Sequence, residues 1–313
     1  MSPADATTQA KDGSSASGRV ARLEPRTLIA LGVTVVLWAS AFAGIRAALP
    51  EYPPGELALL RFLVASGALA VYAAATRMPP PRAADVPAIV GLGLLGVTGY
   101  HLLLNFGEVT VTAGAASLLI ASVPIFTALL AMFFLRERLS VWGWLGILVS
   151  FFGVAVVALG EGEGMTFDPR AVLVLFAALC GAHYFVLQKP LLRRYGALRL
   201  TTYGIWAGTI PFLVFLPGMT RSLSNASAGA TIAVVYLGIF PAAIAYLTWN
   251  YALSRAPASL IASFLYLPPV LAILIAWVWV GELPTTLTVL GGVVAVVGVA
   301  IVNTRGRTRA IPA

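Results

Sequence analysis

The chain has 313 residues, of which 59% are hydrophobic and only 10% are Asp, Glu, Lys or Arg, whereas soluble domains have about 25% charged residues. So few charges cannot cover the surface of a soluble domain of this length, and the composition therefore predicts an all-α integral membrane protein. The net charge of +8 does not indicate nucleic-acid binding, because the basic residues lie between apolar runs and at the chain ends.

In chain order, the apolar runs predict ten membrane-spanning helices between two polar tails. Residues 1–27 lack the short apolar core of a signal peptide, so we expect a disordered cytoplasmic tail there and a second cytoplasmic tail over 306–313. Each run has the roughly 20 residues that a helix needs to cross the hydrocarbon core. The expected spans are 28–49, 55–76, 85–107, 112–135, 140–160, 170–192, 200–218, 231–254, 257–280 and 284–303.

The positions of the basic residues predict the orientation of these spans. Of the 20 Lys and Arg residues, Arg46, Arg170 and Arg221 fall on the outer side and Arg61 falls within a span, which leaves 16 for the cytoplasmic side. Because cytoplasmic loops are enriched in Lys and Arg, this bias predicts that both termini are cytoplasmic. We expect a multi-pass protein of the bacterial inner membrane.

The sequence repeats itself at an offset of 145 residues, and the repeat divides it into units 28–160 and 161–305. The matched polar, proline and glycine residues are Asn105 with Asn250, Pro124 with Pro269, Glu137 with Glu282, Gly146 with Gly291, and Gly153 with Gly298. Five helices per unit is an odd number, so the second unit begins on the opposite side of the membrane. Inverted repeats of this kind are typical of secondary transporters, which bind substrate between the repeats.

Several short motifs occur in order in the two units. They are Leu37–Phe42 around Trp38, Leu60-Arg61-Phe62, Ala115–Leu119 before Pro124, Arg136–Leu139, and Gly281-Glu282 before Gly291 and Gly298. Over residues 28–303 their order and spacing resemble the EamA branch of the drug/metabolite transporter superfamily. The resemblance implies a single bundle that exports amino acids or other small metabolites, with a cavity walled by the helices of both units. The chain departs from the pattern at His183, which occupies the position that Trp38 has in the first unit.

Polar and aromatic side chains within the spans are the candidates for lining that cavity: Trp38, Arg61, Tyr100, His101, Ser122, His183, Tyr184, Tyr246, Trp249, Ser263 and Tyr266. Arg61 either extends outward to pair with Glu56 or binds a substrate carboxylate in the cavity. His101 and His183 either couple proton movement to transport or are neutral residues bonded to helix carbonyls.

Prolines, asparagines and glycines at repeated positions are candidates for gating and packing. Pro124, Pro268 and Pro269 are expected to bend the fourth and ninth helices, as gating elements or as static kinks. Asn105 and Asn250 are expected to bond across helices. The pairs Gly146 with Gly153 and Gly291 with Gly298 each lie on one helix face, which predicts either a seam within the chain or a homodimer contact.

The function that these patterns favour is a secondary transporter working by alternating access, with the lipid bilayer and a small-molecule substrate as its partners. No Walker-type loop, metal-ligand cluster or nucleophile elbow occurs in the sequence, so we expect neither an enzyme nor a cofactor or metal. One alternative is a carrier of nucleotide sugars or phosphorylated metabolites, which needs more cations in the cavity than Arg61 alone. The other is a membrane protein that does not transport, such as a scramblase or an assembly subunit.

Overall fold

The computed structural model describes residues 24–135, 140–161, 167–255, 261 and 264–305. Throughout these residues the regular structure is helical and contains no strand. A helix satisfies its backbone hydrogen bonds within one segment, which is why apolar segments in lipid adopt it. The expected 1–27 and 306–313 tails lie almost entirely outside the described residues, and so do Glu137 and Ser263.

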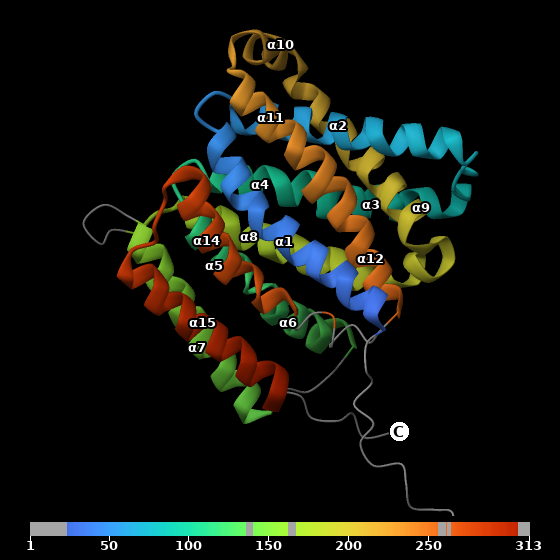
Figure 1. Cartoon of the computed structure of the whole chain (residues 1–313). Coiled ribbons are helices and arrows are strands. Elements are labelled where there is room, and N and C mark those ends of the chain that lie inside the picture. Colours follow the sequence, from blue (N-terminus) through green and yellow to red (C-terminus); the bar gives the residue numbers. More distant parts are fainter. Residues whose placement is uncertain (1–23, 136–139, 162–166, 256–260, 262–263, 306–313) are drawn as a thin grey trace, which may run out of the picture.

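The first unit contains helices joined by short connections (Figure 1). In chain order they are α1 (Pro25–Ala48), α2 (Pro54–Ala75), η1 (Ala83–Asp85), α3 (Val86–Gly93), η2 (Leu94–Gly99), α4 (Tyr100–Gly107), α5 (Ala113–Ile120), α6 (Val123–Leu135) and α7 (Val141–Glu161).

The second unit has the same kind of organisation and packs among the helices of the first (Figure 1). Its helices are α8 (Arg170–Leu187), α9 (Lys189–Thr209), η4 (Ile210–Phe215), α10 (Leu216–Asn225), α11 (Ala228–Leu237), η5 (Gly238–Ile244), α12 (Ala245–Arg255), η6 (Phe264–Tyr266), α14 (Pro268–Val280) and α15 (Thr286–Arg305).

Helical segments of the described chain coincide with each expected span. Seven of them are long and apolar enough to cross a membrane, and three further apolar helices, Ala113–Thr127, Pro268–Val280 and Thr286–Val302, are shorter. This confirms an all-helical, membrane-embedded chain, while the inverted ten-helix arrangement stays a prediction. The seventh span was expected to end at residue 218, and this end is wrong. The chain changes to a 3-10 helix at Ile210, next to Pro211, and α10 continues to Asn225.

The prolines of the fourth and ninth expected spans start new helices and do not bend continuous ones. α5 ends at Ile120, and α6 begins at Val123 with Pro124 as its second residue. Pro268 and Pro269 are the first two residues of α14. Proline has a fixed φ and no N–H, which suits the first turn of a helix. Within the described residues the regular α-helix is thus interrupted just before each of these prolines, and their roles as gating elements or static kinks stay predictions.

Two π-helical stretches interrupt the third and eighth spans. η2 joins α3 to α4, and η5 joins α11 to α12. They end at Gly99 and Ile244, which are 145 residues apart, the offset of the sequence repeat. π-helical turns are rare, and where they occur they are often at functional sites. η2 contributes Gly96 to the lining of the cavity described below, and η5 ends two residues before Tyr246, which also lines it.

α7 and α15 pack side by side at one edge of the molecule (Figure 1). α10 lies far from them, at one end of the bundle (Figure 1). The glycines that were expected to pack helices make this contact. A Cβ on Gly146 would meet the carbonyl oxygen of Gly298 at 2.7 Å, and one on Gly291 would meet that of Gly153 at 2.8 Å. Of the two expected uses of these glycine faces, the structure shows the seam within the chain, and the homodimer stays a prediction.

Candidate substrate site

An internal cavity lies between the first and second units. Side chains from α1, α2, α4, α5, α8 and α12 line it, together with the start of α14. Its volume is about 80 Å³, where one water molecule needs about 10–15 Å³ by the same measure. In this conformation the cavity therefore suits a short ligand.

Most of the expected cavity residues meet here. Those that line it are Trp38, Arg61, Tyr100, His101, Tyr184 and Tyr246. Pro268 and Pro269, which were expected as gating residues, line it as well. The walls are mainly apolar and aromatic, with a few polar groups at fixed places, which is the usual composition of a small-molecule site.

Arg61 is the cation among these lining residues. Its side chain comes from α2 and is only 1% exposed. In the part of the chain that the structure describes, its Nε and Nη1 atoms have no hydrogen-bond partner. Glu56, the acid with which Arg61 was expected to pair at the outer end, instead accepts a hydrogen bond from Ser222. Arg61 therefore lies in the wall of the cavity and does not pair with Glu56, and its binding of a substrate carboxylate stays a prediction.

His101 and Tyr246 form a polar pair at the cavity wall. Nε2 of His101 lies 3.2 Å from the hydroxyl oxygen of Tyr246. That hydroxyl donates to the carbonyl oxygen of Gly96, in η2, at 2.9 Å. His101 and Tyr246 are 145 residues apart, so equivalent positions of the two units meet here.

Aromatic rings from both units form one wall of the cavity. The ring of Trp38 lies 5.8 Å from that of Tyr246, at a steep angle, and 6.3 Å from the ring of Phe185. Trp249 lies 5.1 Å from Trp38, behind the lining residues and not among them. The wall therefore has a second aromatic layer, which fixes the orientation of Trp38.

Of the other expected site residues, Ser122 and His183 are not part of the cavity lining. Ser122 is buried at the break between α5 and α6 and donates to the carbonyl of Leu119. Nδ1 of His183 lies 2.9 Å from the carbonyl oxygen of Leu179, one turn earlier in its own helix. Ser263 and the side chain of Tyr266 are outside the described residues.

Asn105 and Asn250 are buried and join helices to one another. Nδ2 of Asn105 donates to the carbonyl of Pro54, at the start of α2, at 3.2 Å. Nδ2 of Asn250 donates to the hydroxyl of Thr201, in α9, at 2.8 Å. These amides bond to neighbouring helices and are absent from the lining of the cavity.

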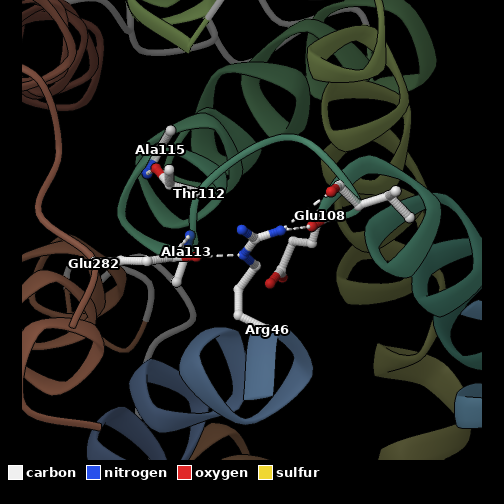
Figure 2. A network of polar contacts seen from close by, with 7 residues as sticks. Arg46, Glu108, Thr112, Ala113, Ala115 and Glu282 are labelled. Carbon is white, nitrogen blue, oxygen red and sulfur yellow. Dashed lines mark hydrogen bonds and ion pairs between the residues drawn. The ribbon is translucent and has the colours of Figure 1, made fainter. Parts of the chain in front are cut away.

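A polar network joins the last turn of α1 to the end of α4, the start of α5 and the end of α14 (Figure 2). Nε of Arg46, in the last turn of α1, lies 2.6 Å from Oε1 of Glu282, and its Nη1 donates to the carbonyl of Glu108 at 2.6 Å. Oε2 of Glu282 accepts from the N–H of Ala113, the first residue of α5. Gly281 adopts a left-handed conformation with φ of 72° and ends α14 just before Glu282. Arg46 and Glu282 therefore tie α1, the end of α4, the start of α5 and the end of α14 together.

Glu108 is a second unsatisfied charged side chain. It is the C-cap residue of α4 and is fully buried. Neither of its carboxylate oxygens has a hydrogen-bond partner within the described residues. A buried ionised carboxylate without partners is costly, so this environment favours the protonated form.

Sequence reasoning missed part of the site. The lining residues that it did not single out are Ala41, Phe42, Gly96, Leu104, Ser117, Ile120, Ala121, Val123, Gly181, Phe185 and Leu265. Most are apolar residues that look the same whether they face lipid or a cavity. Gly96 had a usable signal, because a glycine five residues before His101 leaves room for a ring, and a Cβ there would collide with Tyr184. No group of three or more His, Cys, Asp or Glu residues in the described chain is arranged to hold a metal ion.

Apolar helices of membrane-spanning length surround a cavity with mainly apolar walls, as in a membrane transporter. Comparison with known proteins agrees, and the protein is a multi-pass membrane transporter and not an enzyme. The chain belongs to the EamA-like transporter family, whose model matches residues 26–159 and again residues 169–304.

Two relatives are similar over nearly the whole chain. An uncharacterized transporter, YdfC, of Bacillus subtilis is 46% identical over 273 residues, covering 87% of this chain and 89% of the relative. A probable terminal-alkyne amino-acid exporter of Streptantibioticus cattleyicolor is 43% identical over 283 residues, covering 90% and 95%. One crystal structure, 24% identical, covers 88% of this chain and 94% of its own with a TM-score of 0.61, and so shares the fold.

Proposed function

We propose that the protein exports short apolar α-amino acids or closely related amphipathic compounds, and that Arg61 binds their carboxylate. The observation that carries this proposal is the buried guanidinium of Arg61, in a cavity with apolar walls, whose Nε and Nη1 have no hydrogen-bond partner among the described residues. Guanidinium groups bind carboxylates through two parallel hydrogen bonds. An unpartnered buried cation is costly, so a ligand that satisfies it gains free energy on binding.

The relative from Streptantibioticus supports the amino-acid class. That protein is named a probable terminal-alkyne amino-acid exporter, and such amino acids combine a charged head with an apolar side chain. A cavity of about 80 Å³ with aromatic walls suits such a side chain. Nucleotide sugars and sugar phosphates fit less well, because Arg61 is the one Lys or Arg among the described lining residues.

The transport cycle that we propose is alternating access between two inverted five-helix units, 28–160 and 161–305. Support comes from the 145-residue repeat, the discontinuous helices at Pro124 and Pro269, and the contact between His101 and Tyr246. A residue and its repeat equivalent touch only close to the axis that relates the two units. Both termini would then be cytoplasmic.

Proteoliposomes test the proposed function. Purified protein should accelerate the flux of labelled L-propargylglycine and L-norvaline, with saturation at high substrate. Arg61→Gln should reduce this flux by at least about tenfold, since a hydrogen bond to a charged group contributes about 1.5–3 kcal/mol. Arg61→Lys keeps the charge and loses the bidentate geometry, so its flux should lie between those of the wild type and Arg61→Gln. Equal flux in the wild type and Arg61→Gln, or no flux with any amino acid, would overturn the proposal.

We further propose that protons drive export and that Glu108, rather than His183, holds the coupling proton. Glu108 is buried without a partner, whereas His183 is bonded within its own helix. With Glu108→Gln, uphill export driven by a pH gradient should be lost, while exchange of labelled for unlabelled substrate should continue. Persistence of uphill export in this variant would contradict the assignment.

A further inference from the structure

The hydrogen bonds around Tyr246 fix the tautomer of His101. The Tyr246 hydroxyl has one proton, and it donates that proton to the carbonyl oxygen of Gly96, at 2.9 Å, because a carbonyl can only accept. The same oxygen lies 3.2 Å from Nε2 of His101 and must accept there. Nε2 therefore carries a hydrogen, and in the neutral ring Nδ1 has a free lone pair.

The surroundings of His101 favour the neutral ring. The Phe62 ring contacts both groups, with its centroid 4.7 Å from that of the imidazole and 5.5 Å from Cζ of Arg61. A second positive charge this close to the buried guanidinium is unfavourable. His101 is 3% exposed, so water does not screen the repulsion.

Nδ1 of His101 is a buried acceptor that lacks a donor. No hydrogen-bond partner for this atom occurs within the described residues, and the side chain lines the cavity. Arg61, in the same cavity, presents donors that lack an acceptor. The cavity thus offers a cationic donor and a neutral acceptor, which match the carboxylate and the ammonium of an α-amino acid.

We propose that Nδ1 of His101 accepts a hydrogen bond from the ammonium group of an α-amino acid whose carboxylate binds Arg61. This inference rests on the proposed function and adds a specificity-determining residue to it. The ring of Tyr100, 4.8 Å from that of His101, adds an aromatic surface on which a cation is stabilised. Tyr246 acts as a positioning residue, since its hydroxyl keeps the hydrogen of His101 on Nε2.

Calorimetric binding to the purified full chain separates the two head-group contacts. The ligands are L-norvaline, pentanoate, which lacks the amino group, and norvaline amide, which lacks the carboxylate. Asparagine places an amide oxygen near the position of Nδ1, whereas glutamine reaches toward the position of Nε2. His101→Gln should therefore weaken norvaline binding by about 10- to 100-fold and leave pentanoate binding unchanged. His101→Asn should retain norvaline binding within a few fold.

The ligand pattern distinguishes failure of this inference from failure of the proposed function. If His101→Gln weakens norvaline and pentanoate equally, or weakens neither, then His101 does not read the ammonium group. Arg61→Gln should weaken norvaline and pentanoate together and spare the amide, and a different pattern would overturn carboxylate binding at Arg61. Failure of the wild type to bind norvaline would overturn both. The melting temperature of each variant, measured without ligand, identifies any that do not fold.

Discussion

Arg61 lines the cavity, and Arg46 lies in the polar network at the end of α1. Their guanidinium groups differ in how many hydrogen-bond partners they have. Arg46 has a carboxylate and two backbone carbonyls as partners, whereas Nε and Nη1 of Arg61 have none among the described residues. A fully bonded arginine stabilises one conformation, and a buried unbonded one is available to a ligand. We therefore assign Arg46 to closure of the outer end and Arg61 to binding.

The first prediction concerns this closure. Arg46→Gln or Glu282→Gln removes the ion pair that ties α1 to the end of α14 and should destabilise the closed outer end by roughly 1–2 kcal/mol. In a Cys180→Ala background, a cysteine at Ser117, which lines the cavity, should then react several-fold faster with an impermeant maleimide added outside. Arg221→Gln, at an exposed outer position, is the control. Unchanged labelling in both ion-pair variants would contradict the role of this network.

A second prediction concerns Glu51, in the loop between α1 and α2. Hydrogen bonds from the backbone N–H and hydroxyl of Ser227, the N-cap of α11, hold the pKa of its carboxyl below the ordinary value of 4.5. Because the folded-state pKa is depressed, its stabilising contribution is complete above about pH 4.5 and is lost as pH falls through the lowered pKa.

In detergent, the melting temperature of the wild type should therefore fall between about pH 5 and about pH 3 more steeply than that of Glu51→Gln. Glu24→Gln, at an exposed carboxyl that makes no side-chain cap bond, should follow the wild type. Parallel curves for the wild type and Glu51→Gln would show that the bonds to Ser227 do not stabilise the fold.

At the scale of elements, the repeat predicted which helices pack closely but not where helices break. Glycines at Gly146, Gly153, Gly291 and Gly298 mark close approach directly, because only a small residue allows two backbones to meet. Proline is less informative, since Pro124 would have the same sequence context in a bent helix or at the start of a new one. Of the π-helical stretches, η5 contains Pro241, which cannot make the α-helical hydrogen bond, whereas η2 contains no proline to mark it in the sequence.

The third prediction tests the seam between α7 and α15. An alanine Cβ at Gly291 would lie 2.7 Å from the backbone nitrogen of Val157 and 2.8 Å from the carbonyl oxygen of Gly153. Since neither backbone can yield locally, Gly291→Ala should destabilise the protein by about 1–3 kcal/mol. At Gly67, in α2, nothing lies within 4 Å of an added Cβ, so Gly67→Ala should be neutral or slightly stabilising. Equal melting temperatures for the two variants would contradict a tight seam.

At the scale of the molecule, composition and the positions of charges were sufficient for the membrane class, whereas the division into two inverted units stays a prediction. The cavity required three-dimensional information. Its lining combines residues from distant segments, such as Arg61, His101 and Tyr246, and sequence cannot distinguish their inward-facing apolar neighbours from those that face lipid. Whether a polar atom has a hydrogen-bond partner also becomes visible only in the packed structure. This difference distinguishes Arg46 from Arg61 and leaves a free lone pair on His101.

The last prediction concerns the orientation of the two units. Near Phe167, at the start of the second unit, the hydroxyl of Thr110 donates to Asp168 at 2.6 Å, and Thr110 follows the carbonyls to which Arg46 donates. Around Thr304, the carbonyl of Arg305 accepts from Ser140, and the end of α15 lies with the start of α1 at the end of the bundle away from α10 (Figure 1). Five of the expected membrane spans, from 170–192 to 284–303, lie between the two sites. An odd number of crossings should place the two sites on opposite sides of the membrane.

Single cysteines at these two exposed positions, Phe167→Cys and Thr304→Cys, test this directly in the Cys180→Ala background. An impermeant maleimide added to intact cells should label Phe167→Cys at once and Thr304→Cys only after the membrane is permeabilised. Labelling of both from the same side would leave an even number of crossings between them. The two units could not then be inverted, and alternating access around a shared cavity would lose its structural basis, whereas opposite labelling leaves Arg61 and His101 between two units of opposite orientation.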